Sequence, residues 1–202
     1  EGKSEAELIE EFVGIVQEKD PDVIEGYNLF EFDLDFLHQR AMRHGIRLSM
    51  GREVNETRGQ LEKLPYQKSI KIGAETQYIP YFTVVGRELI DVLHAVRRWN
   101  AISRKLENHR LKETAIHFGL AEADREYIDQ QQQPLAEVYK VDPQRVRSYA
   151  LADVRETMGL SNILSQSNFE LAKIVPMAYQ DLAVSGSSRP IDYLMVRGYM
   201  HH

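Results

Sequence analysis

The stretch DPDVIEGYNLFEFD (residues 20–33) decides the architecture that we expect for this chain. Asp20-Pro21 ends a preceding helix, because proline disfavours helical backbone in the residue before it. Val23-Ile24 predicts a short strand that runs into a loop at Gly26, and a second helix begins at Asp33. A helix, a strand, a loop and a helix in this order favour an α/β fold.

Four side chains between the strand and the second helix are candidate binding residues: Tyr27, Asn28, Phe32 and Asp33. Ligand-binding residues of α/β folds gather at the carboxyl ends of strands. An aspartate at a helix start also has a structural use, because it caps the first turn and complements the helix dipole. For Asp33 taken alone the structural role is the more common one, and Tyr27 and Phe32 taken alone are more typical of a core.

Capping signals and hydrophobic periodicity predict the elements around this stretch. A capping box at Ser4 opens the first helix, and β-rich runs at Ser69–Ile72 and Tyr78–Val85 predict a hairpin-like pair. The other predicted elements are a strand in Glu88–Leu93 that ends near Asp91, a largely helical stretch over residues 94–120, a helix from Asp142-Pro143 to about Leu164, a helix that a capping box opens at Ser167, and a short helix from Pro190.

The helix predicted over residues 142–164 carries an acid on its apolar stripe. At 100° per residue, Asp153 falls near the middle of that stripe, and Tyr149 lies one turn before it. The charged neighbours, including Glu156, are predicted to point elsewhere. A carboxylate on a core-facing stripe is costly unless it is paired or holds a metal ion. An Asp153 paired with an arginine or a backbone amide remains the common alternative.

Composition is that of an ordinary globular chain, with 43% hydrophobic and 28% charged residues in 202. The chain has no cysteine, which removes thiolate metal sites, and its seven histidines lack metal-ligand spacing. Nothing approaches eighteen consecutive apolar residues, so we expect no membrane partner.

The chain has a net charge of −6, but one stretch is basic. Residues 94–112 contain six arginines and lysines and the single acid Glu107. This basic stretch could follow the backbone of single-stranded DNA. A solvated helix face is the more common explanation of such a pattern.

Together these residues resemble a known family. Asp20 to Asn28 followed by Phe32-Asp33 resembles the second exonuclease motif of family B DNA polymerases, and Tyr149-x-x-x-Asp153 resembles their third motif. Further pieces occur in the family's order, namely Gly51-Arg52, Gly86-Arg87 leading to Asp91, Leu111 to Gly119, Asn168 to Gly186, and Ile191 to Arg197. The resemblance covers nearly the whole chain and is nearest to the bacterial and archaeal branch.

The resemblance implies a ribonuclease H-like 3′→5′ proofreading exonuclease that uses two Mg²⁺ or Mn²⁺ ions. Asp33 and Asp153 would then be metal-linked catalytic carboxylates, and Tyr149 would orient the attacking water or the scissile phosphate. Tyr27, Asn28 and Phe32 would contact the single-stranded 3′ end of the DNA. The implied partners are the palm, fingers, thumb and N-terminal domain of the same polymerase, in a cytoplasmic, nucleoid-associated setting.

The sequence departs from the family pattern at one place. The family's first motif, Asp-x-Glu on the opening strand, does not occur before the Ser4 helix. We therefore expect an N-terminally incomplete α/β exonuclease region over residues 1–165 and a helical segment that leads to the palm over 166–202. This chain should bind divalent ions weakly and cleave DNA poorly or not at all.

Two other hypotheses remain. The chain could be a non-catalytic ribonuclease H-like module that binds nucleic acid or serves a structural purpose, in which case the parent protein would also lack Asp-x-Glu. It could instead be a free-standing nuclease of the same fold, although the segment from Ser167 to His202 looks like a lead into a further domain.

Overall fold

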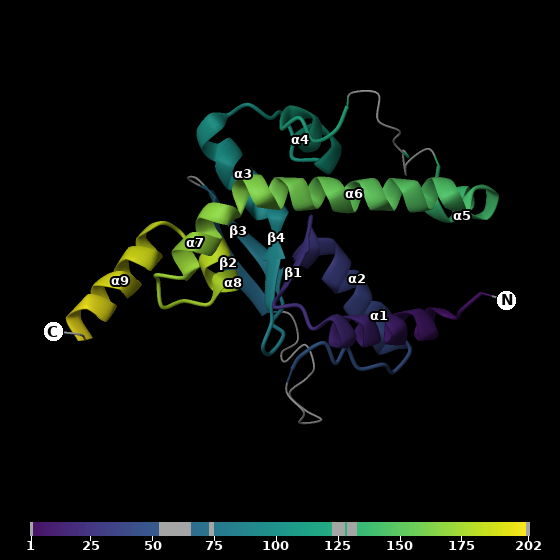
Figure 1. The fold of residues 1–202 in the computed structure, drawn as a ribbon, viewed down its shortest axis with the longest axis horizontal. Helices are drawn as coiled ribbons and strands as arrows, with labels where there is room; N and C mark the ends of the chain where they lie inside the picture. Colours follow the sequence, from purple (N-terminus) through teal and green to yellow (C-terminus); the bar gives the residue numbers. More distant parts are fainter. Residues whose placement is uncertain (1, 53–65, 73–74, 123–127, 129–132, 201–202) are drawn as a thin grey trace.

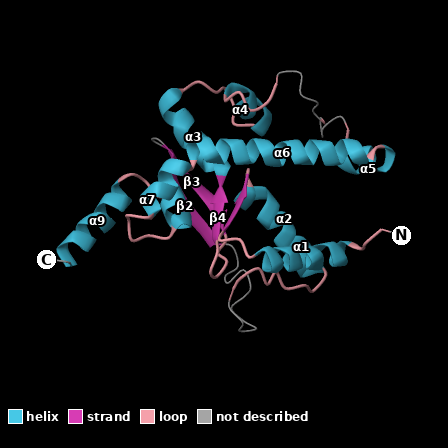
Figure 2. Ribbon diagram, viewed as in Figure 1, coloured by secondary structure: helices cyan, strands magenta, loops and turns pink. Residues whose placement is uncertain are grey.

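The computed structural model describes residues 2–52, 66–72, 75–122, 128 and 133–200 and shows a mixed arrangement of helices and strands (Figures 1 and 2). The strands lie near the centre. In the view of Figure 1 the long helix α6 (Pro143–Leu164) runs above the strands, and α1 (Glu5–Lys19) and α2 (Leu34–Arg43) lie below α6 and beside the strands. The α/β class predicted from the sequence is confirmed at this level.

The strands form two pairs. β1 (Val23–Gly26) runs parallel to β4 (Glu88–Asp91), with Gly26 opposite Asp91. β2 (Tyr66–Ile72) and β3 (Glu75–Tyr81) are antiparallel, as the predicted hairpin requires. Among the described residues β1 pairs with β4 alone, so the other edge of β1 has no neighbouring strand.

The first helix forms as the sequence predicts. Ser4 Oγ accepts a hydrogen bond from the Glu7 amide, and the Glu7 carboxylate accepts one from the Ser4 amide at 2.7 Å, which completes the capping box. Asp20 ends the helix in the left-handed conformation, directly before Pro21. The residues of α1 that are buried against the core are Ile9, Val13 and Val16.

A core of apolar side chains joins the strands to α1, α2 and the turn between β1 and α2. Its fully buried members include Phe30, Ile79 and Phe82. Phe30 and Tyr81 pack with their ring centroids 5.2 Å apart, which joins the turn after β1 to strand β3. This packing fixes where the chain leaves β1.

The helical stretch predicted over residues 94–120 is in fact two helices, α3 (Val92–Ser103) and α4 (Leu111–His117). Arg104 ends α3 in the left-handed conformation. The Asn100 side chain accepts a hydrogen bond from the Leu106 amide at 2.9 Å and donates one to the Leu106 carbonyl at 3.0 Å. These bonds replace helical ones and hold the break, so the stretch is largely helical as predicted but is divided into two helices.

The capping box predicted at Ser167 is also absent. The next helix, α7 (Gln166–Ala172), begins directly after α6, because the Ser165 amide still donates to the Ser161 carbonyl at 2.8 Å. Ser167 therefore lies inside a helix that has no side-chain cap. The remaining helices are α5 (Leu135–Val141), α8 (Tyr179–Val184) and α9 (Ser188–Met200).

The chain beyond residue 165 contacts the central strands through α8. The Gln180 side chain accepts a hydrogen bond from the Leu89 amide at 2.9 Å and donates one to the Phe82 carbonyl at 2.6 Å. Helix α9, at the C-terminal end, extends away from the body (Figure 1). No helix in the described part of the chain is long and apolar enough to span a bilayer.

Candidate active site

The loop after β1 is held by Asp91 at the end of the neighbouring strand. Its carboxylate accepts hydrogen bonds from the amides of Asn28 at 2.9 Å, Phe30 at 3.3 Å and Leu93 at 3.0 Å. Asn28 has a left-handed backbone (φ 65°), which turns the chain out of the strand. Asp91 is 5% exposed, and burial raises its pKa to about 6, although the three amide donors act in the opposite direction.

Asp33 lies at the end of a π-helical turn, η1 (Leu29–Asp33), that leads directly into α2. Its backbone is already helical and its side chain makes no capping hydrogen bond, so the predicted capping role is wrong. The side chain reaches solvent, yet the apolar side chains around it raise the pKa of its carboxyl above the ordinary value by displacing water.

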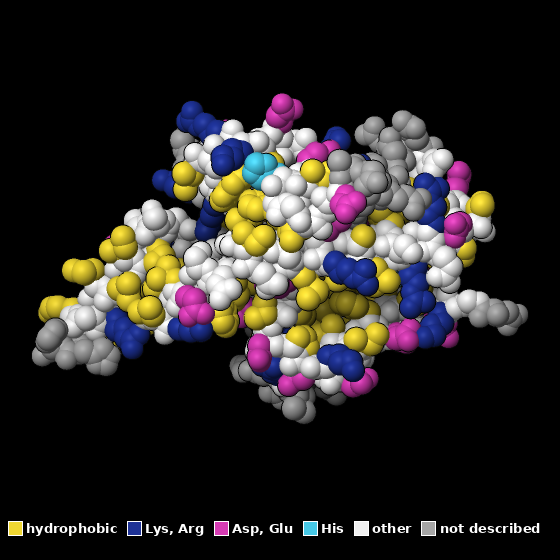
Figure 3. Space-filling view, turned by 45° about the horizontal axis from the view of Figure 1, so that its top comes forward, with side chains coloured by type: hydrophobic (Ala, Val, Ile, Leu, Met, Phe, Trp, Pro, Cys, Tyr) yellow, Lys and Arg dark blue, Asp and Glu magenta, His cyan; other side chains and the backbone are white. Residues whose placement is uncertain are grey.

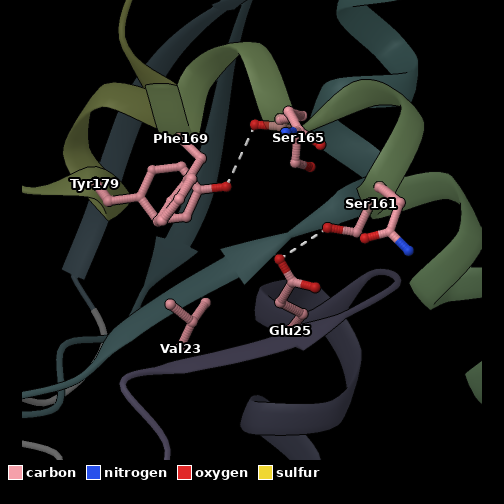
Figure 4. Close-up of a pocket in the computed structure, with 8 residues that line it drawn as sticks. Val23, Glu25, Ser161, Ser165, Phe169 and Tyr179 are labelled. Carbon is pink, nitrogen blue, oxygen red and sulfur yellow. Dashed lines mark hydrogen bonds between the residues drawn. The ribbon is translucent and has the colours of Figure 1, made fainter. Parts of the chain in front are cut away.

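Helix α6 positions the second carboxylate of the predicted pair. Asp142 caps the helix by accepting a hydrogen bond from the Arg145 amide at 3.0 Å, which confirms the predicted start. Asp153 is half-buried on the side of α6 that faces β1. Two turns later the Ser161 hydroxyl donates to Glu25 of β1 at 2.8 Å, in a polar pocket of about 410 Å³ (Figure 4). This contact fastens α6 to the strand.

Asp33 and Asp153 line the same cavity, which has a volume of about 520 Å³. The cavity lies among β1, the turn into α2 and α6, and most of its wall is apolar. A space-filling view shows hydrophobic side chains gathered in a hollow near the middle of the face (Figure 3). The remaining lining residues are Phe12, Ile24, Glu25, Gly26, Tyr27, Leu29, Leu34, Leu37, Met50, Leu111, Val154, Thr157 and Met158.

Tyr149 lies one turn before Asp153 on α6 and is half-buried, but it is not among the residues that line this cavity. Tyr27 does line the cavity. Its hydroxyl donates to the His109 carbonyl at 2.7 Å and lies 3.3 Å from Thr114 Oγ1. Burial raises the pKa of Tyr27 to about 12, so this hydroxyl stays protonated and ties the loop to α4.

The other two predicted DNA-binding residues differ in exposure. The side-chain oxygen of Asn28 is buried and has no hydrogen-bond partner among the described residues. Phe32 is 60% exposed and stacks on the equally exposed Phe36, with the ring centroids 6.4 Å apart and the planes 12° apart. Phe32 therefore belongs to a solvent-facing aromatic pair next to Asp33, and not to the core.

The sequence did not identify two buried acids near the site. Asp91 lies at the end of a strand and directly before a helix. Residues 27–33 were predicted as a binding site because of the same position between a strand and a helix. Glu156 was predicted to point away from the core, but it is 4% exposed. No group of three or more acids and histidines suited to a metal ion occurs within the described ranges. The cavity thus brings together two carboxylates of the predicted kind.

The comparisons with known proteins agree with this geometry. The sequence profile described as "DNA polymerase family B, exonuclease domain" matches residues 1–114. The DNA polymerase of Pyrococcus glycovorans is 26% identical over 196 residues, which cover 96% of this chain and 22% of the relative. DNA polymerase 1 of Pyrococcus abyssi is 25% identical over 96% of this chain and 23% of its own length.

A solved structure is similar over the whole chain. The family B DNA polymerase from the hyperthermophilic archaeon Pyrobaculum calidifontis matches 100% of this chain and 24% of its own, with a TM-score of 0.72 and 25% identity. The chain thus spans between a fifth and a quarter of these relatives. The bacterial and archaeal branch inferred from the motifs includes these archaeal matches. On this evidence the chain belongs to the exonuclease domain of the family B DNA polymerases.

Proposed function

We propose that this chain forms part of a ribonuclease H-like 3′→5′ proofreading exonuclease within a family B DNA polymerase. One observation carries the proposal. Asp33 follows the loop after β1 and Asp153 lies on α6, far along the sequence, yet both line one cavity. Two acids that converge on a cavity in this way are typical of a catalytic centre.

The carboxylates of Asp33 and Asp153 suit divalent cations such as Mg²⁺ or Mn²⁺, which prefer oxygen ligands. Bound ions would activate a water molecule and stabilise the leaving oxygen of a phosphodiester. The apolar wall supports this assignment, because it displaces part of the water around the Asp33 carboxylate and raises its pKa, and a cation would stabilise the charged form. Tyr149 would orient the water or the scissile phosphate from the same helix.

In the part of the chain that the structure describes, three carboxylates line the cavity, and that of Glu25 already accepts a hydrogen bond from Ser161. Asp33 and Asp153 are then the two proposed to hold cations, fewer than two hard cations need. The free edge of β1 borders the cavity, since Ile24, Glu25 and Gly26 line it. A further strand of the parent polymerase that paired with this edge would add its side chains to the same wall. We propose that such a strand carries the Asp-x-Glu motif, and that residues 1–202 alone are inactive without it.

The exposed Phe32 supports a single-stranded substrate. Phe32 and Phe36 present a stacked pair of rings to solvent beside Asp33. Aromatic rings hold unpaired bases without reading their identity, at about 1–3 kcal/mol per base. Proofreading needs such tolerance, because any mispaired 3′ base must enter the site. Asn28, with its buried unpaired oxygen, and Tyr27 would support this surface.

The helical segment over 166–202 is proposed to lead to the palm. Helix α9 exposes apolar side chains along its length, and hydrophobic side chains follow the projecting arm in Figure 3. A helix of this kind normally packs against a further part of the protein. The rest of the polymerase is the proposed partner of the exposed apolar residues of α9 that line none of the described cavities, namely Tyr193, Met195, Val196, Tyr199 and Met200.

The test uses the full-length polymerase that contains this chain. Asp33→Asn and Asp153→Asn should each slow removal of 3′ nucleotides from a 5′-labelled strand by at least about 100-fold, with polymerisation unchanged. Asp35→Asn is the matched control, because Asp35 belongs to the same helix as the residues after Asp33 but contacts Gln39 instead of the cavity. Unchanged digestion by both variants would favour the non-catalytic module.

A second assay uses the 202-residue chain alone with Mn²⁺ and the same labelled strand. We expect no cleavage above that of its Asp153→Asn variant. Cleavage that disappears in the variant would show that another acid within residues 1–202 completes the site.

A further inference from the structure

A third cavity, of about 680 Å³, lies between α3, α7 and the start of α9. It shares no lining residue with the cavity of Asp33 and Asp153. Among the described residues, its wall contains two cations, Arg98 of α3 and Lys71 of β2, and no acid. The other lining residues are Ala101, Ile102, Asn168, Leu171, Leu182, Ser185, Gly186, Ser187, Ser188, Pro190, Ile191 and Leu194.

Arg98 belongs to the basic stretch whose common explanation was a solvated helix face, and for this residue that explanation is wrong. One terminal nitrogen of its guanidinium is buried and has no hydrogen-bond partner among the described residues. Burial also lowers the pKa of Arg98 below its ordinary value. The adjacent Arg97 differs, because it lies 3.5 Å from Glu31 and donates to Gln77 at 3.3 Å. Arg98 is half-buried, and a cation that is partly removed from water without a counter-charge among the described residues is destabilising, so an anion in the cavity would stabilise it.

The surroundings of Arg98 favour an anion with several acceptor oxygens. Lys71 adds a second positive charge from an exposed position at the rim. Asn168 and the serines of the loop before α9 add amide and hydroxyl groups to the wall. A phosphomonoester carries a charge of about −1.5 to −2 at neutral pH and three acceptor oxygens, which matches two cations and several donors better than a single carboxylate does.

The rest of the wall is apolar, formed by Leu171, Leu182, Pro190, Ile191 and Leu194. The volume of this cavity lies within the range of about 300–1,000 Å³ that is common for small-molecule pockets. We propose that this cavity binds a phosphomonoester on an organic body of nucleotide size, with the phosphate on Arg98 and Lys71 and the body against the apolar wall. This site is separate from the exonuclease site and does not rest on its assignment.

Binding is tested by calorimetric titration of the 202-residue chain with 5′-deoxyadenosine monophosphate. We expect saturable binding that Arg98→Gln weakens by at least about 10-fold, since hydrogen bonds to charged groups are the stronger ones. Lys71→Gln should weaken it by about 3-fold or more, because a rim charge contributes less. Arg110→Gln is the matched control, which removes an exposed charge of the same basic stretch outside the cavity and should change affinity less than about 2-fold.

The ligand's parts are tested with deoxyadenosine, inorganic phosphate and citrate. If all three bind more weakly than 5′-deoxyadenosine monophosphate, the proposal is supported. If citrate or inorganic phosphate binds as tightly as the nucleotide, the proposal is overturned. The same group occurs on a free nucleotide and at the 5′ end of a strand, so short oligonucleotides with and without a 5′ phosphate distinguish these sources. Tighter binding of an acidic peptide, or affinity that neither Arg98→Gln nor Lys71→Gln alters, contradicts the assignment.

Folding of the Arg98 variant is checked independently. Removing an uncompensated buried charge should raise the thermal midpoint of Arg98→Met in the absence of ligand, while the nucleotide should raise the midpoint of the unsubstituted chain alone. If Arg98→Met does not fold, Lys71→Gln still decides the question, because Lys71 is exposed.

Discussion

The two edges of β1 place aspartates in opposite situations. On the paired edge, Asp91 of β4 is buried and its carboxylate accepts three backbone amides. On the free edge, Asp33 reaches solvent beside a cavity and makes no capping bond. An acid whose acceptors are saturated by backbone holds the fold, whereas an acid that faces an open cavity remains available to a ligand. On this contrast we assign a structural role to Asp91 and propose a functional one for Asp33.

The largest expected effect is on the paired edge. Asp91→Ala leaves three amides of the loop and the start of α3 without their acceptor, and buried unsatisfied donors cost about 1–3 kcal/mol each. We expect the free energy of unfolding, measured with urea, to fall by about 3 kcal/mol. The exposed Asp192→Ala should change it by less than about 0.5 kcal/mol. Similar values for both variants would contradict the structural role of Asp91.

The pH dependence of stability tests the same carboxylate. Burial raises the pKa of Asp91 from 3.8 to about 6 in the folded chain. Between these values the folded chain holds a proton that the unfolded chain has released, so this group's contribution to stability falls as pH rises and is level above about 6. Urea titrations give the free energies of unfolding of the unsubstituted chain and of Asp91→Asn. The first value minus the second should fall as pH rises from 3.8 to about 6. A constant difference would show that Asp91 titrates normally.

An intermediate effect is expected for the aromatic pair on the free edge. Phe32→Ala should weaken the binding of a fluorescent single strand to the full-length polymerase by about 5-fold or more, since one stacked base contributes about 1–3 kcal/mol. The exposed Tyr139→Ala, on α5, is the control. An equal loss of affinity in both variants, measured by fluorescence anisotropy, would show that Phe32 does not contact the DNA.

The smallest effect should come from Asp33 itself. Asp33→Asn removes a charge that apolar neighbours disfavour and that caps no helix, so the free energy of unfolding should be unchanged or slightly higher, within about 0.5 kcal/mol. Urea denaturation at neutral pH gives this value directly. A loss comparable to that of Asp91→Ala would make Asp33 a structural residue and erase the contrast between the two edges.

Local chemistry in the sequence was sufficient to predict much of the fold. The capping box at Ser4, the Asp142-Pro143 helix start and the pairing of β2 with β3 depend on neighbouring residues, and all three are confirmed. The break between α3 and α4 depends on the Asn100 side chain, which periodicity does not reveal. The capping box at Ser167 failed because α6 continued its backbone bonds into the next helix.

The sequence predicted candidate site residues but not how they are arranged, and their roles stay predictions. Motif spacing selected Asp33 and Asp153, and the structure places both at one cavity. The hydrogen bonds from the loop to Asp91 join residues about 60 positions apart, and residues of α9 complete the cavity that Arg98 lines. Such contacts arise only when distant segments meet, so no local pattern could have predicted them. The roles assigned to Tyr149, Tyr27 and Asn28 stay predictions.

The most direct test of the central claim is paramagnetic broadening by Mn²⁺ in the amide NMR spectrum of the 202-residue chain. Broadening detects weak ion binding, which two carboxylates should give. We predict that sub-stoichiometric Mn²⁺ broadens amides around Asp33 and Asp153 together, and that Asp33→Asn or Asp153→Asn abolishes both effects. Broadening centred elsewhere, or unchanged in both variants, would contradict a shared metal site on the free edge of β1.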